Sequence, residues 1–155
     1  MKLNKENAFY NYLKIKEMIG LTMSQKCRLL SEMLFFTEDS WRVVGITENA
    51  LKVFAKNGFK KVPRMGINRS HIIERNKTYT KLLEGEFDCD NFWSIFLEND
   101  KTILSTSSEN MSKSNSRIIK FDCDSKLFKP SGYSWSHTRK ESNLLKEIHE
   151  RECFD

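Results

Sequence analysis

The stretch Trp41-Arg-Val-Val-Gly-Ile-Thr47-Glu-Asn-Ala-Leu-Lys-Val-Phe-Ala-Lys-Asn-Gly58 holds the strongest structural signal in the chain. Residues 41–46 are rich in aromatic and β-branched types, which predicts a short strand. Thr47 is a residue type that favours helix N-caps, and Gly58 is placed to end the helix. One helical face collects the apolar residues Ala50, Leu51 and Phe54. A strand that runs directly into an amphipathic helix over 47–57 is therefore expected.

Helical periodicity also marks the N-terminal part of the chain. Apolar residues recur at helical spacing over 4–19, and Gly20 is placed to end that helix. Thr22 or Ser24 would cap a second helix that continues to about Phe36. Two helices with so short a connection predict an antiparallel helical hairpin.

The rest of the chain mixes helix and strand signals. Helices are predicted over about 71–84 with Ser70 as cap, over 91–98 with Asp90 as cap, and over 136–152. Residues 101–106 and 117–122 predict a β-hairpin, joined by a polar loop over 107–116. This order predicts an α+β fold rather than a parallel doubly wound sheet, with an N-terminal helical hairpin, a short strand and helices, a β-hairpin and a C-terminal helix.

Composition favours a globular chain. The 155 residues suit a single domain, 1–155, and 39% hydrophobic with 30% charged residues argue against a disordered chain. No apolar run approaches the roughly 20 residues of a membrane helix, and the N-terminus lacks the apolar stretch of a signal peptide. A soluble cytoplasmic protein is expected. The cysteines at 27, 89, 123 and 153 form no Cys-x-x-Cys pair, which favours free thiols over a zinc site.

Charge is distributed unevenly along the chain. Residues 51–82 carry nine bases and one acid, whereas 83–100 carry six acids and no base. Clustered bases predict polyanion binding, and the alternative is a solvated lysine-rich helix face. The expected partner is nucleic acid, with double-stranded DNA favoured, no membrane, and a homodimer left open. The bases expected to contact it are Lys52, Lys56, Lys60, Lys61, Arg64, Arg69, Arg75 and Lys77.

His71 lies inside this basic region. A neutral imidazole there could accept a proton from a water that attacks a phosphodiester, while Arg69 and Arg75 hold the phosphates. The alternative is a surface or capping histidine in a basic helix.

The stretch Asp100-Lys-Thr-Ile-Leu-Ser-Thr106-Ser-Ser-Glu109-Asn110 resembles the end of the motif in HNH (ββα-metal) endonucleases of the phage homing and restriction type. The matching residues are Thr106 and the dipeptide Glu109-Asn110. The resemblance implies a metal-dependent DNA endonuclease that uses Mg²⁺ or Mn²⁺. It implies His71 as general base, Asn110 as a catalytic metal ligand and Asp100 as a second ligand. The alternative for the string is a strand that enters a polar hairpin loop.

Two other groups of residues suggest chemistry. Asp122, Asp124 and Lys126, with Asp100 or Asp90 upstream, imitate the Asp…Asp-x-Lys metal site of restriction-type nucleases. An aromatic and basic group could stack on unpaired bases or anchor a loop, and it comprises Tyr133, Trp135, His137, Arg139 and Lys140. Three functional classes stay open: a nuclease, a non-enzymatic nucleic-acid-binding protein, and a charge-polarised interaction or inhibitor protein.

Overall fold

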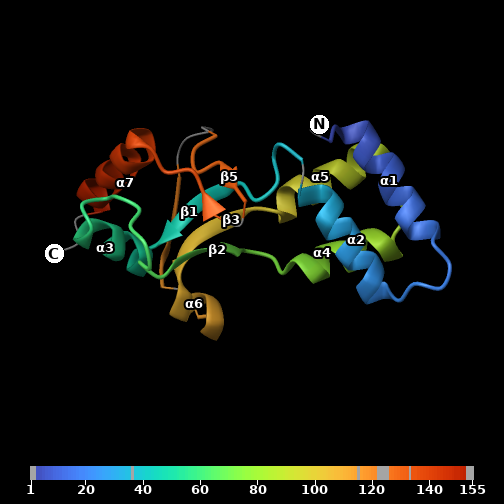
Figure 1. Cartoon of the computed structure of the whole chain (residues 1–155), viewed down its shortest axis with the longest axis horizontal. Helices are drawn as coiled ribbons and strands as arrows, with labels where there is room; N and C mark the ends of the chain where they lie inside the picture. The colour runs from blue at the N-terminus through green and yellow to red at the C-terminus, as the bar shows by residue number, and fades with distance from the viewer. Residues whose placement is uncertain (1–2, 36, 115, 122–125, 133, 153–155) are drawn as a thin grey trace. The chain divides into compact units, whose positions relative to one another are not determined.

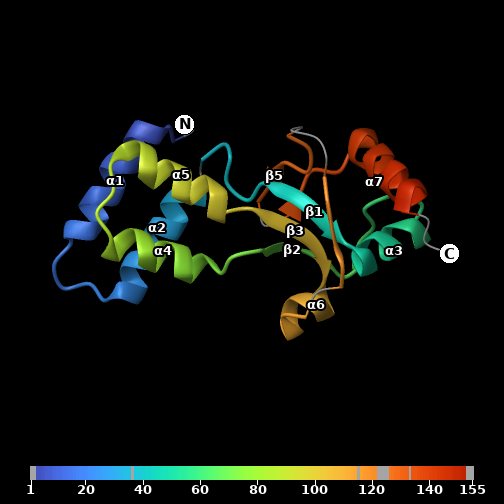
Figure 2. The ribbon, with the colours of Figure 1, turned by 180° about the vertical axis from the view of Figure 1, so that it is seen from behind.

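The computed structural model describes residues 3–35, 37–114, 116–121, 126–132 and 134–152 (Figures 1 and 2). The described part of the chain divides into two compact units, each drawn from two separate stretches. Unit 1 comprises Met1–Trp41 and His71–Lys101, and unit 2 comprises Arg42–Ser70 and Thr102–Asp155. Helices and a small sheet occur together, which confirms the α+β class. The single-domain expectation stays a prediction.

Unit 1 is helical. Its helices are α1 (Lys5–Glu17), α2 (Met23–Phe35), α4 (Arg75–Glu84) and α5 (Cys89–Asn99). Helix α1 packs against α2 as the predicted helical hairpin, α4 packs against α2 and α5, and α5 also contacts α1. Gly20 has a φ of +82° in the connection between α1 and α2, a conformation that glycine adopts without steric cost.

Aromatic side chains fill the core of unit 1. The fully buried rings of Tyr12 and Phe92 stack with their centroids 4.5 Å apart. The Tyr12 hydroxyl donates a hydrogen bond of 2.6 Å to the carbonyl oxygen of Leu82, so its burial leaves no unpaired polar atom. Each buried aromatic residue of this kind removes about 150–250 Å² from water. The apolar faces of α1, α4 and α5 are thereby joined in one core.

Unit 2 is built on a sheet. The described strands of this sheet are β1 (Val43–Thr47), β2 (Ile67–His71), β3 (Thr102–Thr106) and β4 (Ile118–Lys120), in the order β2-β3-β1-β4. Strand β1 pairs parallel with β3 and antiparallel with β4. The prediction that 101–106 and 117–122 pair with each other is therefore wrong, because β1 lies between them. Residues Thr102–Ser105 are all buried, as suits a strand with neighbours on both sides.

Helices and a short hairpin complete unit 2. Helix α3 (Glu48–Lys56) contacts β1, β3 and α7 (Arg139–Glu152), the predicted C-terminal helix. A β-hairpin does form, from β5 (Pro130–Ser131) and β6 (Ser134–Trp135). The expected polar loop after β3 begins instead as helix α6 (Ser107–Ser112). None of the helices formed by the described residues is long and apolar enough to cross a membrane.

Helix caps test the local predictions. Thr47 caps α3 as predicted, since its hydroxyl accepts from the Ala50 N–H at 3.2 Å. Thr22 is the residue that caps α2, accepting from the Gln25 N–H at 3.2 Å. Helix α5 is capped by Asp88 rather than by the predicted Asp90. The helix predicted from His71 begins at Arg75, because residues up to His71 belong to β2, where sheet pairing outweighs local helix propensity.

Candidate functional site

His71, the predicted general base, is hydrogen-bonded to Asp100 within unit 1. The imidazole Nε2 lies 2.9 Å from Asp100 Oδ1, and the exposed fractions of the two side chains are 9% and 3%. His71 is the last residue of β2, and Asp100 caps the C-terminus of α5. A strand end and a helix end therefore bring together two residues that are 29 positions apart in the sequence.

The second oxygen of Asp100 is also engaged. Asp100 Oδ2 accepts from the Ser40 hydroxyl at 3.0 Å and from the Trp41 N–H at 2.8 Å. These bonds hold the carboxylate through the oxygen that His71 does not contact. An ionised carboxylate only accepts hydrogen bonds, so the network assigns the proton of His71 to Nε2. Nδ1 then keeps its lone pair, as a general base requires.

Trp41 and Arg75 pack beside this pair. The Trp41 ring meets the His71 ring edge to face, with 4.4 Å between centroids, and the Arg75 guanidinium carbon lies 4.9 Å from the Trp41 centroid. Arg75 is itself held, since Nη2 donates to Ser31 Oγ at 2.5 Å and Nε donates to Tyr79 Oη at 3.2 Å. We call Ser40, Trp41, His71, Arg75 and Asp100 the His71 site.

The described side chains do not form a ready metal site. No group of three or more His, Cys, Asp or Glu residues within the described ranges is placed to hold a metal ion. Both oxygens of Asp100 accept hydrogen bonds from His71, Ser40 and Trp41, which suits a positioning role better than metal ligation. Metal ligation by Asp100 and Asn110 stays a prediction.

Asn110 belongs to unit 2, where it lies on α6. Its Oδ1 accepts from the Ser70 hydroxyl at 2.9 Å, and Ser70 also hydrogen-bonds to Ser105. This amide oxygen thus already has a protein donor. His71 belongs to unit 1, whereas Asn110 belongs to unit 2.

The Thr106-x-x-Glu109 part of the HNH-like string is a capping box. Thr106 Oγ1 accepts from the Glu109 N–H at 3.3 Å, and Glu109 Oε2 accepts from the Thr106 N–H at 2.9 Å. This reciprocal pair explains why α6 forms where a loop was expected. The spacing of a Thr and a Glu three residues later was the sequence signal that could have predicted it.

Glu109 also joins three segments of unit 2. Its carboxylate accepts from the Thr47 hydroxyl at 2.8 Å, from Asn49 Nδ2 at 3.2 Å and from the Ser116 hydroxyl at 2.7 Å. Burial alone would raise the pKa of this carboxyl, but the hydrogen bonds, with those from Ser116 first, outweigh burial and lower the pKa to about 2. Glu109 is therefore an ionised structural centre that links β1, β3 and the segment before β4.

The predicted nucleic-acid-binding bases are divided between the units. Most of them belong to unit 2 and are exposed there: Lys52, Lys56, Lys60, Lys61 and Arg64. Arg69 also belongs to unit 2, but it is only 7% exposed and its Nη2 donates to the Gly132 carbonyl at 3.3 Å. Arg75 and Lys77 belong to unit 1. Lys52 and Lys77 form ion pairs with Glu48 and Glu74, at 2.6 and 3.8 Å.

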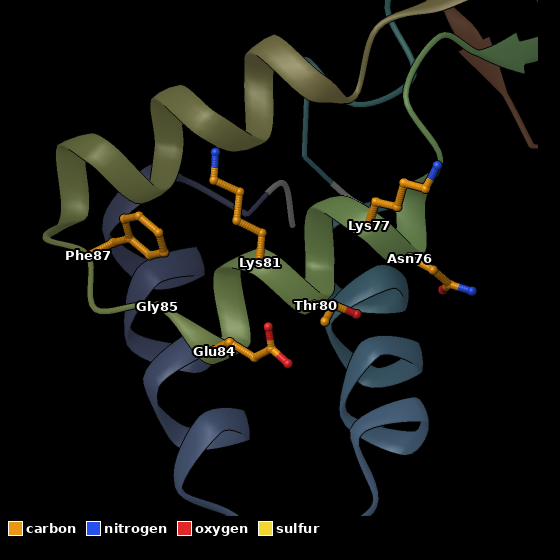
Figure 3. Close-up of a pocket in the computed structure, with 7 residues that line it drawn as sticks. All are labelled: Asn76, Lys77, Thr80, Lys81, Glu84, Gly85 and Phe87. Carbon is orange, nitrogen blue, oxygen red and sulfur yellow. The ribbon is translucent and has the colours of Figure 1, made fainter.

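Two hollows lie near these bases, one in each unit. In unit 1, a hollow of about 530 Å³ lies along α4. Figure 3 shows the residues that line it, which are Asn76, Lys77, Thr80, Lys81, Glu84, Gly85 and Phe87. In unit 2, a hollow of about 480 Å³ is lined by Gly58, Lys60, Lys61, His137, Thr138, Arg139 and Ser142, which we call the α7 hollow. Sequence reasoning missed the α7 hollow, because Lys61 and His137 are far apart in the chain and no local pattern joins them.

Several predicted residues lie outside the described ranges, namely Asp122, Cys123, Asp124, Tyr133 and Cys153. Of the remaining cysteines, Cys27 is buried and Cys89 is half-buried, and both are free thiols. Lys126 is exposed. Trp135 is buried in the core of unit 2, which fits the expectation that it anchors its loop.

Comparison of the chain with protein-family models, curated proteins and solved structures found no match.

Proposed function

We propose that this protein binds nucleic acid and hydrolyses its phosphodiester bonds, with His71 as the general base and Asp100 as the residue that positions it. The observation that carries the proposal is the 2.9 Å contact between His71 Nε2 and Asp100 Oδ1, because the second oxygen of the same carboxylate accepts from Ser40 and Trp41. Support also comes from the basic segment that contains His71.

The chemistry follows from the proton positions. His71 Nδ1 accepts a proton from a water molecule as the water oxygen attacks phosphorus, and the P–O bond to the leaving oxygen breaks. The imidazolium that forms is stabilised by the adjacent Asp100 carboxylate and can return its proton to the leaving oxygen. The fixed guanidinium of Arg75 adds positive charge beside Trp41, where it favours an approaching phosphate.

The HNH resemblance implies Mg²⁺ or Mn²⁺, and a divalent ion would neutralise charge on the phosphate. Asp100 and Asn110 are the residues that the resemblance assigns to it. The side-chain oxygens of both residues already accept hydrogen bonds from protein donors. Cleavage should be measured with Mg²⁺, with Mn²⁺ and with a chelator.

A second candidate is a nucleic-acid-binding protein without hydrolytic activity. The exposed lysines of unit 2 favour it, because they supply charge for phosphates without needing a reacting group. In that case the His71–Asp100 pair would only stabilise unit 1.

A plasmid-nicking assay with matched histidine variants tests the proposal. His71→Ala should lower kcat by about 10² to 10⁴ and leave DNA affinity within a few-fold, because binding rests on other residues. His149→Ala on α7 is the control and should keep activity. Added imidazole should partly restore His71→Ala, and Asp100→Asn should lower kcat more than it changes KM.

Two outcomes contradict the proposal in different ways. If the wild-type protein cleaves no DNA or RNA with Mg²⁺, with Mn²⁺ or without metal, the enzyme proposal fails and the binding candidate stands. If the wild-type protein cleaves and His71→Ala, shown by its thermal unfolding to be folded, keeps full rate, His71 is not the base. The group Asp100, Asp122, Asp124 and Lys126 would then be tested next.

A further inference from the structure

The α7 hollow gathers positive charge from two separate segments of unit 2. Lys60 and Lys61 follow the end of α3, and Arg139 begins α7. All three bases are exposed, and all three residues line the same hollow, which has a volume of about 480 Å³. That volume lies within the roughly 300–1,000 Å³ of sites that take small ligands.

The acid nearest in sequence to this hollow is engaged elsewhere. The Glu141 carboxylate is buried and accepts from the N–H and the hydroxyl of Thr138 and from the Phe128 N–H. Burial would raise the pKa of Glu141, but these hydrogen bonds lower it, so the group is ionised. Its one negative charge is directed at protein donors, and the surrounding Lys60, Lys61 and Arg139 leave the hollow positive.

Lys61 is held in place at the edge of the hollow. Its Nζ donates to Ser134 Oγ at 2.5 Å and to the Trp135 carbonyl at 2.8 Å, and it lies 4.3 Å from the Trp135 ring centroid. An ammonium has three N–H donors, and these two bonds use two of them. Burial, and then the charge of Arg69, lowers the pKa of Lys61, and a bound anion would offset both effects.

His137 and Ser142 form a rigid, polar wall of the hollow. The His137 ring stacks on Phe54 with centroids 5.3 Å apart, and Nε2 lies 2.9 Å from the Phe59 carbonyl oxygen. A carbonyl only accepts, so Nε2 carries the proton and donates it. Ser142 Oγ, which lies 3.2 Å from the same nitrogen, then acts as an acceptor there. The hydrogen of the Ser142 hydroxyl can then donate to a ligand.

We propose that the α7 hollow binds a phosphate group of nucleic acid through Lys60, Lys61, Arg139 and the Ser142 hydroxyl. A phosphate presents several acceptor oxygens, and donors from two separate segments match that arrangement better than a single ion pair would. This inference rests on the nucleic-acid binding proposed above and adds the place where a phosphate is held.

Binding measurements in a chelator test the inference without any need for cleavage. The probe is a short single-stranded oligonucleotide with a 5′-phosphate, compared with the same oligonucleotide bearing a 5′-hydroxyl and with orthophosphate. Lys60→Ala/Arg139→Ala is the test variant. Lys120→Ala/Lys129→Ala is the control, because it removes the same charge from exposed positions of the same unit.

The test variant should weaken oligonucleotide binding at least about tenfold. It should also reduce the slope of log K against log salt by roughly 0.7, the value for one lost phosphate contact on a single strand. The control should change both much less. In the wild-type protein, orthophosphate should shift the backbone amide NMR signals of Arg139 and Ser142.

The two oligonucleotides distinguish the source of the phosphate. If the wild-type protein binds the 5′-phosphate oligonucleotide more tightly and the test variant does not, the hollow holds a terminal phosphate. If the wild-type protein binds both oligonucleotides equally and orthophosphate competes with them, the hollow holds a backbone phosphate. Equal losses in the test and control variants, without amide shifts from orthophosphate, would overturn the inference. His71→Ala should bind the oligonucleotides like the wild type. The binding assay therefore tests the α7 hollow separately from the cleavage activity proposed above.

Discussion

Replacing Glu109 by Gln should destabilise unit 2 strongly. The carboxylate accepts from Thr47, Asn49, Thr106 and Ser116, whereas a glutamine amide presents one oxygen and one donor NH₂ group to the same donors. A backbone N–H, of Thr106 or of Ser116, would then face an N–H of the amide. Both the charge and part of the hydrogen bonding are lost.

The shifted pKa sets the magnitude. A carboxyl whose pKa falls from 4.5 to about 2 on folding contributes about 3 kcal/mol of stability at pH 7. Because the folded-state pKa is the lower one, this contribution is fully present above pH 4.5 and is lost as the pH falls through about 2. The difference in stability between the wild type and Glu109→Gln should therefore be constant near neutral pH and shrink by about 1.4 kcal/mol per pH unit below 4.5.

Urea unfolding followed by circular dichroism from pH 7 to pH 3 measures this difference. Glu147→Gln on the exposed side of α7 is the matched control and should change stability by less than about 0.5 kcal/mol. A loss below about 1 kcal/mol for Glu109→Gln would refute the reasoning. So would a loss that does not depend on pH, because the ionised carboxylate would then not be its source.

Two further substitutions test neighbouring parts of unit 2 by the same unfolding assay. Thr47→Ala should lower the free energy of unfolding by about 2–4 kcal/mol, because it removes both the cap on the Ala50 N–H and the charge-assisted bond to Glu109. Thr47→Ser keeps the hydroxyl and should lower it much less. Equal losses in the two variants would mean that the missing methyl group, not the hydroxyl, causes the effect. Gly45→Ala should lower the free energy of unfolding by about 1–3 kcal/mol, because the Cβ of the alanine would lie 2.7 Å from the Ile119 carbonyl oxygen of the paired strand. An unchanged stability would mean that β1 and β4 do not approach so closely.

Elements that depend on neighbouring residues were predictable from the sequence. Thr47 and the apolar face behind it specify α3, since the cap bond and the buried stripe both lie within a few positions. The helical hairpin of α1 and α2 follows in the same way from two periodic segments and a short connection. Even the unexpected helix α6 has a local signal, the Thr106 and Glu109 capping box.

Strand order was decided only by the tertiary structure. The stretches 101–106 and 117–122 do form strands, but β1 from far upstream separates them. Alternation of residue types predicts a strand without saying which partner it takes, because pairing depends on long-range burial. The same pairing draws His71 into β2 and delays the next helix to Arg75.

The candidate sites show the same division. The sequence by itself identified His71, Asp100 and the lysines around position 60 as residues with chemical potential, because residue type and charge density are local properties. Only the fold decided that Asp100 accepts from His71, and that Lys61 and Arg139 line one hollow. These relations arise where distant segments pack together, and the free energy that selects them is spread over the whole core of each unit, so no short pattern records them.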